Sequence, residues 1–583
     1  MRKSVTKNHI TLRAIAGTRV VLMAIDIAAV ARPGLLGFAM GRVKDNGVDW
    51  MKGSKVFQSV IPNPDPEKTF PSNKHPIQSL IWSDLVAKPG ATTTYRVQPM
   101  YGPPGAPVLK PGADITITTE DPDKAEHGIY FNFGAIASQA FARNFDSKPP
   151  QDENDPDDKE VKWLARGMLD AALGFIAQAK AGDALHVAAY EFTYEPILLA
   201  LKAAGKSGVK VHIVHEAGKE TVTKKDKVTG EKIKVVQNTS ATNSAAKAIK
   251  AAGLKGATNV TLTKRTKRRN IPHNKFIVWV KNGVAKEVLA GSANFTPSGF
   301  IGQTNVVHIV RKPAVAQAYL DYWTQLSGDP PTTELSTWSQ GVTAHDDITA
   351  LTTPPGVLAV FSPRKNDKLL TWFADAIGGA QQTAMFTGAF GVNKIIAEKF
   401  AVDLDFVRFL LLEDKPDKEL ALKLEVDPDV LAAYGSILGA LPDKKVEFPK
   451  NSLSEWFLKE ELFRKQGNIF FIHTKFLLVD PLTDNPLVVT GSANFSHASL
   501  VDNDENILFI RGDTKVADVY VTEFDRIFRH FFARQAINDR ILKHLAIDES
   551  KFLDETGDWL EQDIGAGQGK KTRQRRFFPN GPT

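Results

Sequence analysis

The chain has 583 residues, too many for one ordinary hydrophobic core, so its length predicts two to four domains. Hydrophobic residues make up 43% and charged residues 24%, a composition typical of soluble globular proteins and unlike that of disordered or membrane-embedded chains. The net charge of +7 permits a polyanionic partner without requiring one, and the lack of cysteine excludes disulfides, thiolate metal sites and cysteine nucleophiles.

The stretch that comes nearest to a membrane helix lies near the N-terminus, VVLMAIDIAAVA at Val20–Ala31. It is shorter than the roughly 18 apolar residues that a membrane helix needs. Asp26 interrupts it, and Arg19 and Arg32 flank it. We therefore expect a buried strand rather than a signal peptide, and a cytoplasmic protein, with secretion through an unusual N-terminal signal left open.

Residues 1–125 contain many short alternating runs, among them TRVVLMAIDI, GLLGFAMGRV and ADITITTE. Proline and glycine turn signals separate these runs. The pattern predicts an all-β sandwich domain. The stretch YRVQPMY, which begins at Tyr95, resembles the late strands of a fibronectin type III-like module.

Beyond an acidic segment at residues 149–160, strand-length apolar runs alternate with helical patterns. ALHVAAYEF and VKVHIVHEA have strand length, whereas WLARGMLDAALGFIAQAK and EPILLALKAAGKSG have helical spacing. The same order returns as KLLTWFADAIGGA, QTAMFTGAF, NKIIAEKFA and VRFLLLED. This repetition predicts an α/β fold with mainly parallel sheets, built from duplicated halves at residues 126–335 and 350–545. We expect a C-terminal helix and a basic tail over residues 546–583.

The strongest signal is a stretch that occurs twice, as IPHNKFIVWVKNGVAKEVLAGSANFT and as FIHTKFLLVDPLTDNPLVVTGSANFS. Histidine and lysine two positions apart on a strand share a face, and the Gly-Ser-Ala-Asn run lies where the following strand ends. A duplication that preserved only packing would not make the polar residues match better than their apolar neighbours. The matched polar residues are His273 and His473, Lys275 and Lys475, Ser292 and Ser492, and Asn294 and Asn494.

If the halves pack with pseudo-twofold symmetry, two imidazoles face each other among these lysines, hydroxyls and amides. Lysine and amide groups stabilise the charge of a phosphodiester in its transition state. One neutral histidine can attack phosphorus, while the other, protonated, gives a proton to the leaving oxygen. This chemistry requires no cofactor and no metal ion, and the sequence offers no obvious carboxylate cluster for one.

The two motifs resemble those of the phospholipase D superfamily, in which HxK(x)4D is followed by GSxxN and two α/β halves form a pseudo-symmetric core. The resemblance covers residues 126–545. It implies that His273 and His473 are the catalytic pair and that one of them forms a phosphohistidine. It also implies phosphate binding by Lys275, Lys475, Asn294 and Asn494, assisted by Ser292 and Ser492.

The chain departs from this family pattern at Val280, where the first motif should have aspartate; the second motif keeps Asp480. In this family the aspartate is not the attacking group. Downstream, we align Asp504-Glu505-Asn506 with Gln303-Thr304-Asn305. A carboxylate there commonly orients a catalytic histidine in the family. We therefore predict this role for Glu505 first and Asp504 next, with Gln303 as the counterpart in the first half.

The identity of the nucleophile stays open at this point. Family habit favours His273, whereas the carboxylate in the second half favours His473. In either case we expect a monomeric, metal-independent phosphodiesterase with a phosphodiester substrate, most simply one that hydrolyses phospholipid headgroups.

Two alternatives remain. A nuclease or DNA-end-processing enzyme is favoured by the basic charge and by KRTKRR at residues 264–269, just before His273. A non-catalytic binding protein on a degenerate core is favoured by Val280. A basic tail permits peripheral contact with an anionic membrane. Its charged residues are Lys570, Lys571, Arg573, Arg575 and Arg576.

Overall fold

The computed structural model describes most of the chain. The residues outside the description are 66–67, 135–140, 142–143, 146–149, 226–231, 344–354, 436–470, 543–550 and 565–583. The five charged residues of the predicted basic tail therefore lie outside the described residues.

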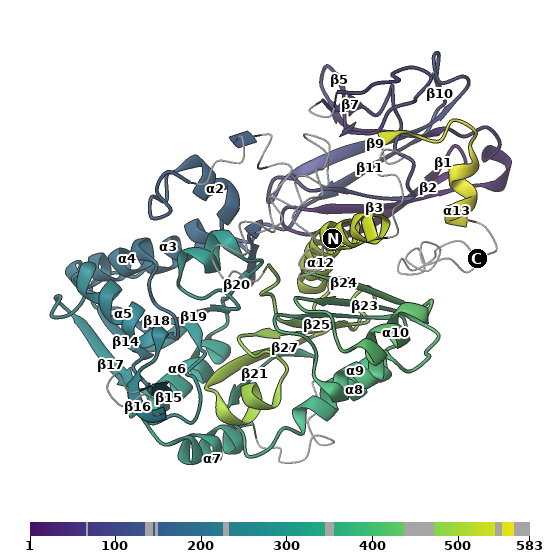
Figure 1. Cartoon of the computed structure of the whole chain (residues 1–583). Helices are drawn as coiled ribbons and strands as arrows, with labels where there is room; N and C mark the ends of the chain where they lie inside the picture. The colour runs from purple at the N-terminus through teal and green to yellow at the C-terminus, as the bar shows by residue number, and fades with distance from the viewer. Residues whose placement is uncertain are drawn as a thin grey trace.

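Two antiparallel sheets face each other at the N-terminal end of the chain, drawn in purple in Figure 1. One has the order β1-β2-β3-β8, and the other has the order β10-β9-β4-β5, with β11 also paired to β9. The strands are β1 (Arg2–Lys7), β2 (Ile10–Ala16), β3 (Val21–Ile27), β4 (Gly37–Lys44), β5 (Gly47–Trp50), β8 (Ile81–Asp84), β9 (Thr92–Tyr101), β10 (Val108–Leu109) and β11 (Ala113–Thr118), with a small pair β6 (Lys52–Gly53) and β7 (Phe70–Pro71).

The core of this region lies between the two sheets. Along β11 buried and exposed residues alternate, as a strand with one covered face requires. Leu12 and Met23 from one sheet and Val97 and Ile115 from the other belong to one apolar cluster. The predicted all-β region is confirmed. The buried strand predicted over Val20–Ala31 is confirmed for Val21–Ile27, which form β3, whereas Ala29–Ala31 form a 3-10 turn without buried residues.

Two seven-stranded mixed sheets follow, with the same strand order in each half. The first has the order β12-β20-β19-β18-β13-β14-β17, and the second has the order β21-β27-β26-β25-β22-β23-β24. The first contains β12 (His127–Phe131), β13 (Ala184–Ala189), β14 (Lys210–Glu216), β17 (Val260–Arg265), β18 (Lys275–Lys281), β19 (Val284–Gly291) and β20 (Val306–Val310). The second contains β21 (Gly356–Ser362), β22 (Thr383–Gly388), β23 (Val407–Leu412), β24 (Val430–Tyr434), β25 (Phe476–Val479), β26 (Leu487–Gly491) and β27 (Glu505–Arg511).

The predicted duplication is confirmed, but the prediction of mainly parallel sheets is wrong. Only β13-β14-β17 and β22-β23-β24 run parallel, and every other neighbouring pair in the two sheets is antiparallel. The reason is the motif itself. β18 and β19 are joined by a short turn with positive φ at Asn282 and Gly283, and such a hairpin forces its strands to run antiparallel.

Helices cover the outer faces of both sheets and fill the space between them (Figure 1). In the first half they are α2 (Lys159–Ala165), α3 (Met168–Ala177), α4 (Glu195–Lys206), α5 (Ser240–Ala251), α6 (Pro313–Ser327) and α7 (Thr332–Val342), with a hairpin of β15 (Lys219–Lys225) and β16 (Lys232–Asn238). In the second half they are α8 (Leu369–Gly378), α9 (Lys394–Phe400), α10 (Lys418–Val426) and α12 (Thr514–Leu542). Short π-helical turns η3 (Ser298–Gly302) and η6 (Ala498–Asp502) follow the two motifs, and the 3-10 turn η1 (Ala29–Ala31) follows β3.

The shared core places α6 and α12 between the two sheets. Tyr319 and Tyr322 of α6 pack in the same apolar cluster as Tyr520 of α12 and the motif residues Phe276 and Phe476. This cluster joins the two halves into one body, because each sheet presents its inner face to these helices.

One helix predicted over residues 163–180 is two helices in the structure. The break lies at Arg166 and Gly167, which both have positive φ, at 51° and 85°. The buried Arg166 guanidinium leaves the helical path and binds Glu523 of α12 at 2.7 Å. Helical spacing in the sequence does not reveal such a long-range ion pair.

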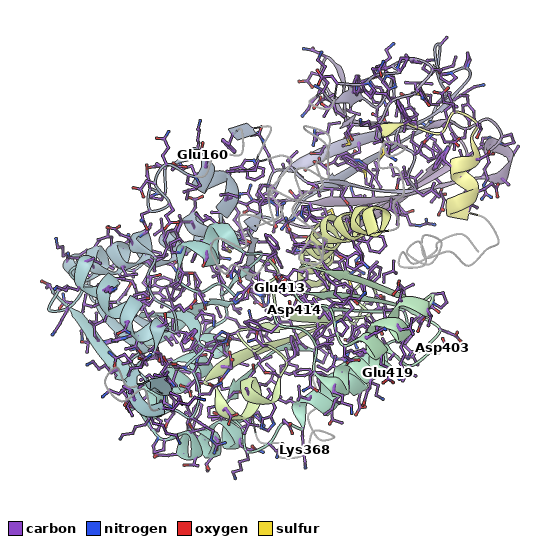
Figure 2. All side chains as sticks on the ribbon, viewed as in Figure 1. Glu160, Lys368, Asp403, Glu413, Asp414 and Glu419 are labelled. Atoms are coloured by element: carbon purple, nitrogen blue, oxygen red, sulfur yellow. The ribbon has the colours of Figure 1, made fainter. Side chains whose placement is uncertain are left out.

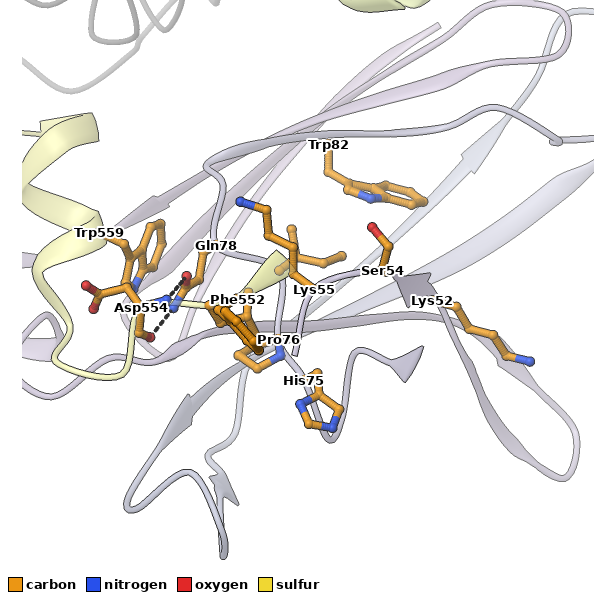
Figure 3. Close-up of a pocket in the computed structure, with 13 residues that line it drawn as sticks. Lys52, Ser54, Lys55, His75, Pro76, Gln78, Trp82, Phe552, Asp554 and Trp559 are labelled. Atoms are coloured by element: carbon orange, nitrogen blue, oxygen red, sulfur yellow. Dashed lines mark hydrogen bonds between the residues drawn. The ribbon is translucent and has the colours of Figure 1, made fainter. Parts of the chain in front are cut away.

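The C-terminal segment, for which a helix and a basic tail were predicted, returns to the N-terminal sheets. After α12 it contains only η8 (Asp558–Leu560) and α13 (Glu561–Ile564) among its described residues. Leu553 N donates to Val56 O at 2.9 Å, and Trp559 Nε1 donates to Leu35 O at 3.0 Å. The C-terminal segment borders a cavity of about 450 Å³ whose walls include Lys55, Trp82 and Trp559 (Figure 3).

Candidate functional site

The two motifs meet because each half binds the loop that precedes the histidine of the other. Thr304 N donates to Phe471 O at 2.9 Å, and His473 N donates to Thr304 O at 3.2 Å. In the reciprocal place, Asp504 N donates to Ile271 O at 3.1 Å. These backbone bonds fix the start of β18 and of β25, so the HxK segments of both halves share one buried region.

The carboxyl ends of the parallel strands point to this same region. Figure 2 shows Glu413 and Asp414 near the centre of the molecule, where β23 ends, whereas Asp403 and Glu419 lie at its outer edge. Ile472 N, next to His473, donates to Glu413 Oε2 at 2.9 Å. Ligand sites in open α/β sheets form at this end of parallel strands.

His273 is oriented by a carboxylate from the opposite half. Its Nδ1 lies 2.9 Å from both Oε1 and Oε2 of Glu505. Glu505 also accepts bonds from Ser492 Oγ at 2.6 Å and from Asn503 Nδ2 at 3.0 Å. The sequence argument that this carboxylate favours His473 is therefore wrong, because it assumed a contact within one half.

His473 is oriented by a neutral amide instead. Its Nδ1 lies 2.9 Å from Asn305 Oδ1, which also accepts a bond from Ser292 Oγ at 2.8 Å. Asn305 Nδ2 donates to Gly299 O at 2.9 Å, so the amide is held from both ends. Asn305 thus occupies in the first half the place that Glu505 occupies in the second.

The predicted role of Gln303 is wrong by two positions. The registers of the two halves are fixed by Ser292 Oγ and Ser492 Oγ, which accept bonds from Val306 N and Asn506 N. These bonds place Asn305 opposite Glu505. The constant 200-residue offset of the two motifs was the sequence signal for this pairing.

Asp504, the second predicted orienting residue, does not bind either histidine. Its carboxylate accepts bonds from Arg265 Nε at 2.8 Å and Arg265 Nη2 at 3.3 Å. Both side chains are fully buried. Asp504 therefore belongs to a buried ion pair that ties β17 to the second half.

The two motif lysines lie beside the histidines and are fully buried. Lys475 Nζ donates to His473 O at 2.7 Å, and Lys275 Nζ donates to His273 O. Burial lowers the pKa of Lys275 to about 7. Burial and the charge of Lys275 lower the pKa of Lys475 well below its usual value. Each ammonium retains further donors for a phosphate oxygen.

The remaining titratable groups of the site are shifted by the same burial. Burial, followed by the charges of Lys275 and Lys475, lowers the pKa of His273 and of His473 well below the usual value. Burial raises the pKa of Glu505 to about 7. Strong shifts in one cluster of facing groups are characteristic of catalytic sites.

The two asparagines differ in their partners. Asn294 Nδ2 donates to Glu191 Oε2, a residue that sequence analysis missed because it follows β13, far from the motifs in the chain. The Oδ1 atoms of Asn294 and Asn494 are buried and have no hydrogen-bond partner among the described residues. Buried polar atoms of this kind are costly, and a ligand group offsets that cost at binding sites.

The basic segment at residues 264–269 is largely engaged within the protein. Arg265 binds Asp504 and also Asp329 at 2.9 Å, and Arg268 Nε donates to Glu216 Oε2 at 2.8 Å. The segment also contains two exposed lysines, Lys264 and Lys267. The hypothesis that the whole segment steers a polyanion is therefore reduced to these two lysines and to Arg269, which binds Asp502 at 2.9 Å.

The aspartate of the second motif, Asp480, binds backbone groups. Asp480 accepts bonds from the backbone N–H groups of Gln381, Gln382 and Thr383 at 2.7–3.1 Å. It follows β25 at the end away from His473. Val280 is paired with Ala184 at the corresponding end of the first sheet. The loss of the first aspartate therefore removes no group from the neighbourhood of the histidines.

The comparison with protein families agrees with this geometry. The family model described as "Cardiolipin synthase, PLD-like domain" matches residues 173–326 and 442–528, one segment in each half. Over these two segments the chain matches the phospholipase D superfamily. This match supports phosphodiesterase-type chemistry.

Among solved structures, Nuc from Salmonella typhimurium, a phospholipase D family member, is 25% identical, with 27% of this chain and 86% of that chain covered and a TM-score of 0.20. Phosphatidylserine synthase from Haemophilus influenzae Rd KW20 is 11% identical, with 66% and 92% covered and a TM-score of 0.38. Polyphosphate kinase from Porphyromonas gingivalis is 11% identical, with 60% of this chain and 43% of that chain covered and a TM-score of 0.34. The present chain thus covers less than half of the length of this kinase.

No curated protein sequence matches the chain. Among the described residues, no helix combines the length and the apolar character needed to cross a bilayer.

Proposed function

We propose that this protein is a metal-independent phosphodiesterase in which His273 forms a phosphohistidine and His473 acts as general acid and base. The observation that carries the proposal is the unequal pair of Nδ1 partners, Glu505 for His273 and Asn305 for His473. An acceptor at Nδ1 keeps the proton on that nitrogen, so Nε2 is the atom available for chemistry in both rings.

The carboxylate makes His273 the better nucleophile. When Nε2 attacks phosphorus, the ring becomes positively charged, and the adjacent Glu505 stabilises that charge. A neutral amide gives no such stabilisation to His473, whose imidazolium is therefore the stronger acid. The usual position of the nucleophile in the family and the contact with Glu505 both favour His273.

In the first step, the Nε2–P bond forms and the bond from phosphorus to the leaving oxygen breaks, as His473 gives its Nε2 proton to that oxygen. Lys275 and Lys475 stabilise the charge on the nonbridging oxygens, and the negative diester in turn raises the pKa of the histidines. In the second step, His473 takes a proton from water, the oxygen attacks phosphorus, and the N–P bond breaks. The products are an alcohol and a phosphomonoester.

For the substrate, we propose a phospholipid whose headgroup is released. The support is that Arg265 and Arg268 are held in internal ion pairs, which leaves little of the basic segment for a nucleic-acid groove. A nuclease remains the second candidate, favoured by the exposed Lys264 and Lys267.

The test is a parallel assay in excess EDTA with phospholipid micelles and with labelled single- and double-stranded DNA. We expect release of the lipid headgroup, loss of at least about a thousandfold in rate for His273→Ala and for His473→Ala, and intact DNA. DNA cleavage without lipid hydrolysis would replace the substrate proposal, and undiminished turnover in both variants would overturn the mechanism.

A further inference from the structure

The phosphate-binding region contains a carboxylate that the proposed reaction does not use. Glu191 lies in the loop between β13 and α4, is half-buried, and accepts a bond from Asn294 Nδ2. Its charge acts on both motif lysines, where it raises the pKa of Lys275 and Lys475 against the effect of burial. Glu191 is therefore adjacent to the groups that would hold the phosphodiester.

The second half lacks this charge at the matching place. β13 and β22 have the same neighbours in their sheets, and the loops from Ala189 to the helix cap Tyr194 and from Gly388 to the helix cap Asn393 have equal length. In this register the counterpart of Glu191 is Phe390, whose side chain is 53% exposed. At this position the pseudo-twofold site thus has a carboxylate on one side and an aromatic ring on the other.

A carboxylate beside a phosphate is unfavourable for substrates that bring a further negative charge, because like charges repel strongly in a partly buried site. The same carboxylate stabilises a substrate that brings a positive charge to this position, through a charge-assisted hydrogen bond. Asn294 alone does not require a charge here, since any acceptor would hold its amide.

We infer that Glu191 is a specificity-determining residue that selects phosphodiesters whose alcohol carries an ammonium group close to phosphorus. This inference rests on the proposed function and narrows its substrate to diesters of amino alcohols. It disfavours nucleic acids, in which the neighbouring groups along the chain are further phosphates.

The test uses two substrates of equal size that differ only in the charge, phosphatidylethanolamine and phosphatidylpropanol, in the same neutral detergent micelles. Wild type should prefer the ethanolamine lipid at least about tenfold in kcat/KM, and Glu191→Gln should remove most of that preference, whatever its effect on the rate common to both lipids. Glutamine retains an acceptor for Asn294, so the variant separates charge from positioning. Glu195→Gln, an exposed residue at the start of α4, is the matched control and should leave both rates unchanged.

A binding measurement separates this inference from the proposed function. Phosphoethanolamine and propyl phosphate are titrated into wild type and Glu191→Gln by calorimetry, which needs no turnover. A preference for phosphoethanolamine that Glu191→Gln abolishes supports the inference even if no lipid is hydrolysed. Equal affinities of wild type for the two ligands, or an equal loss with both in the variant, would overturn it.

Discussion

His273 and Glu505 come from opposite halves of the core, and Nδ1 of the imidazole lies 2.9 Å from each carboxylate oxygen. The reciprocal contact, from His473 to Asn305, also crosses between the halves. Neither histidine is therefore oriented until both halves have docked. The unequal partners, a carboxylate and an amide, divide two otherwise matched histidines into different chemical roles.

Ionisation of Glu505 should reduce stability as the pH rises. Burial raises its pKa from the usual 4.5 to about 7, so between these values the folded protein binds the proton more tightly than the unfolded chain. The contribution of Glu505 to the free energy of unfolding is then fully present below pH 4.5 and is lost as the pH rises through about 7. Urea unfolding of Glu505→Gln should show a smaller loss between pH 5 and pH 7 than wild type, by about 2 kcal/mol. Parallel losses in the two proteins would contradict the shift.

Asn305 should control the pKa of His473, and Gln303 should not. Asn305→Asp preserves the acceptor and adds a charge, so the limb of the pH–rate profile that reports His473 should move upward by about one pH unit. Asn305→Leu, which has no acceptor, should lower kcat about ten- to a hundredfold. Gln303→Ala, the control at the position that the sequence predicted, should change kcat less than about threefold. An unmoved profile in Asn305→Asp would count against the role of the amide.

Asp480 should matter for stability rather than for chemistry. Its carboxylate accepts three backbone N–H groups at the start of β22. Asp480→Ala should lower the free energy of unfolding by about 1–3 kcal/mol, because these donors lose a charged acceptor. Once the variant is folded, its kcat should remain within about twofold of wild type. A large fall in kcat with unchanged stability would instead place Asp480 in the reaction.

Replacing Arg265 should lower stability, whereas replacing the two exposed lysines of its segment should not. Arg265→Ala leaves Asp504 buried without its cation and should cost about 3–5 kcal/mol of stability. Lys264→Ala combined with Lys267→Ala should leave the melting temperature unchanged. If the segment steers an anionic surface or polymer, this double variant should flatten the dependence of KM on salt concentration. A salt dependence that remains as steep as in wild type would exclude that role.

The duplicated α/β fold could be predicted because apolar periodicity and the two motifs are local signals. The mixed sheet could not be predicted so readily, since the parallel order inferred from alternating elements ignored the hairpin that joins β18 to β19. The helix break at Arg166 depends on its ion pair with Glu523, which is 357 residues away in the chain. No pattern around residue 166 announces that partner.

The sequence predicted which residues form the site better than it predicted which of them contact each other. Both histidines, both lysines and Glu505 lie where the motifs indicated, whereas the partner of Glu505 was assigned to the wrong half. Glu505 is 32 positions from His473 and 232 from His273, and sequence distance favoured the wrong contact. Glu191 lies in a loop far from the motifs, so only the folded structure reveals its contact with Asn294.

The most direct test is to trap the covalent intermediate in the His473→Ala variant with a phosphatidyl ester of 4-nitrophenol. This leaving group needs no general acid, whereas hydrolysis of the intermediate lacks its base. We predict a burst of about one nitrophenolate per protein molecule and, by mass spectrometry, a phosphatidyl adduct on the peptide that contains His273. We also predict that the His273→Ala variant shows no burst. An adduct on His473 in the His273→Ala variant, together with no adduct on His273, would contradict it.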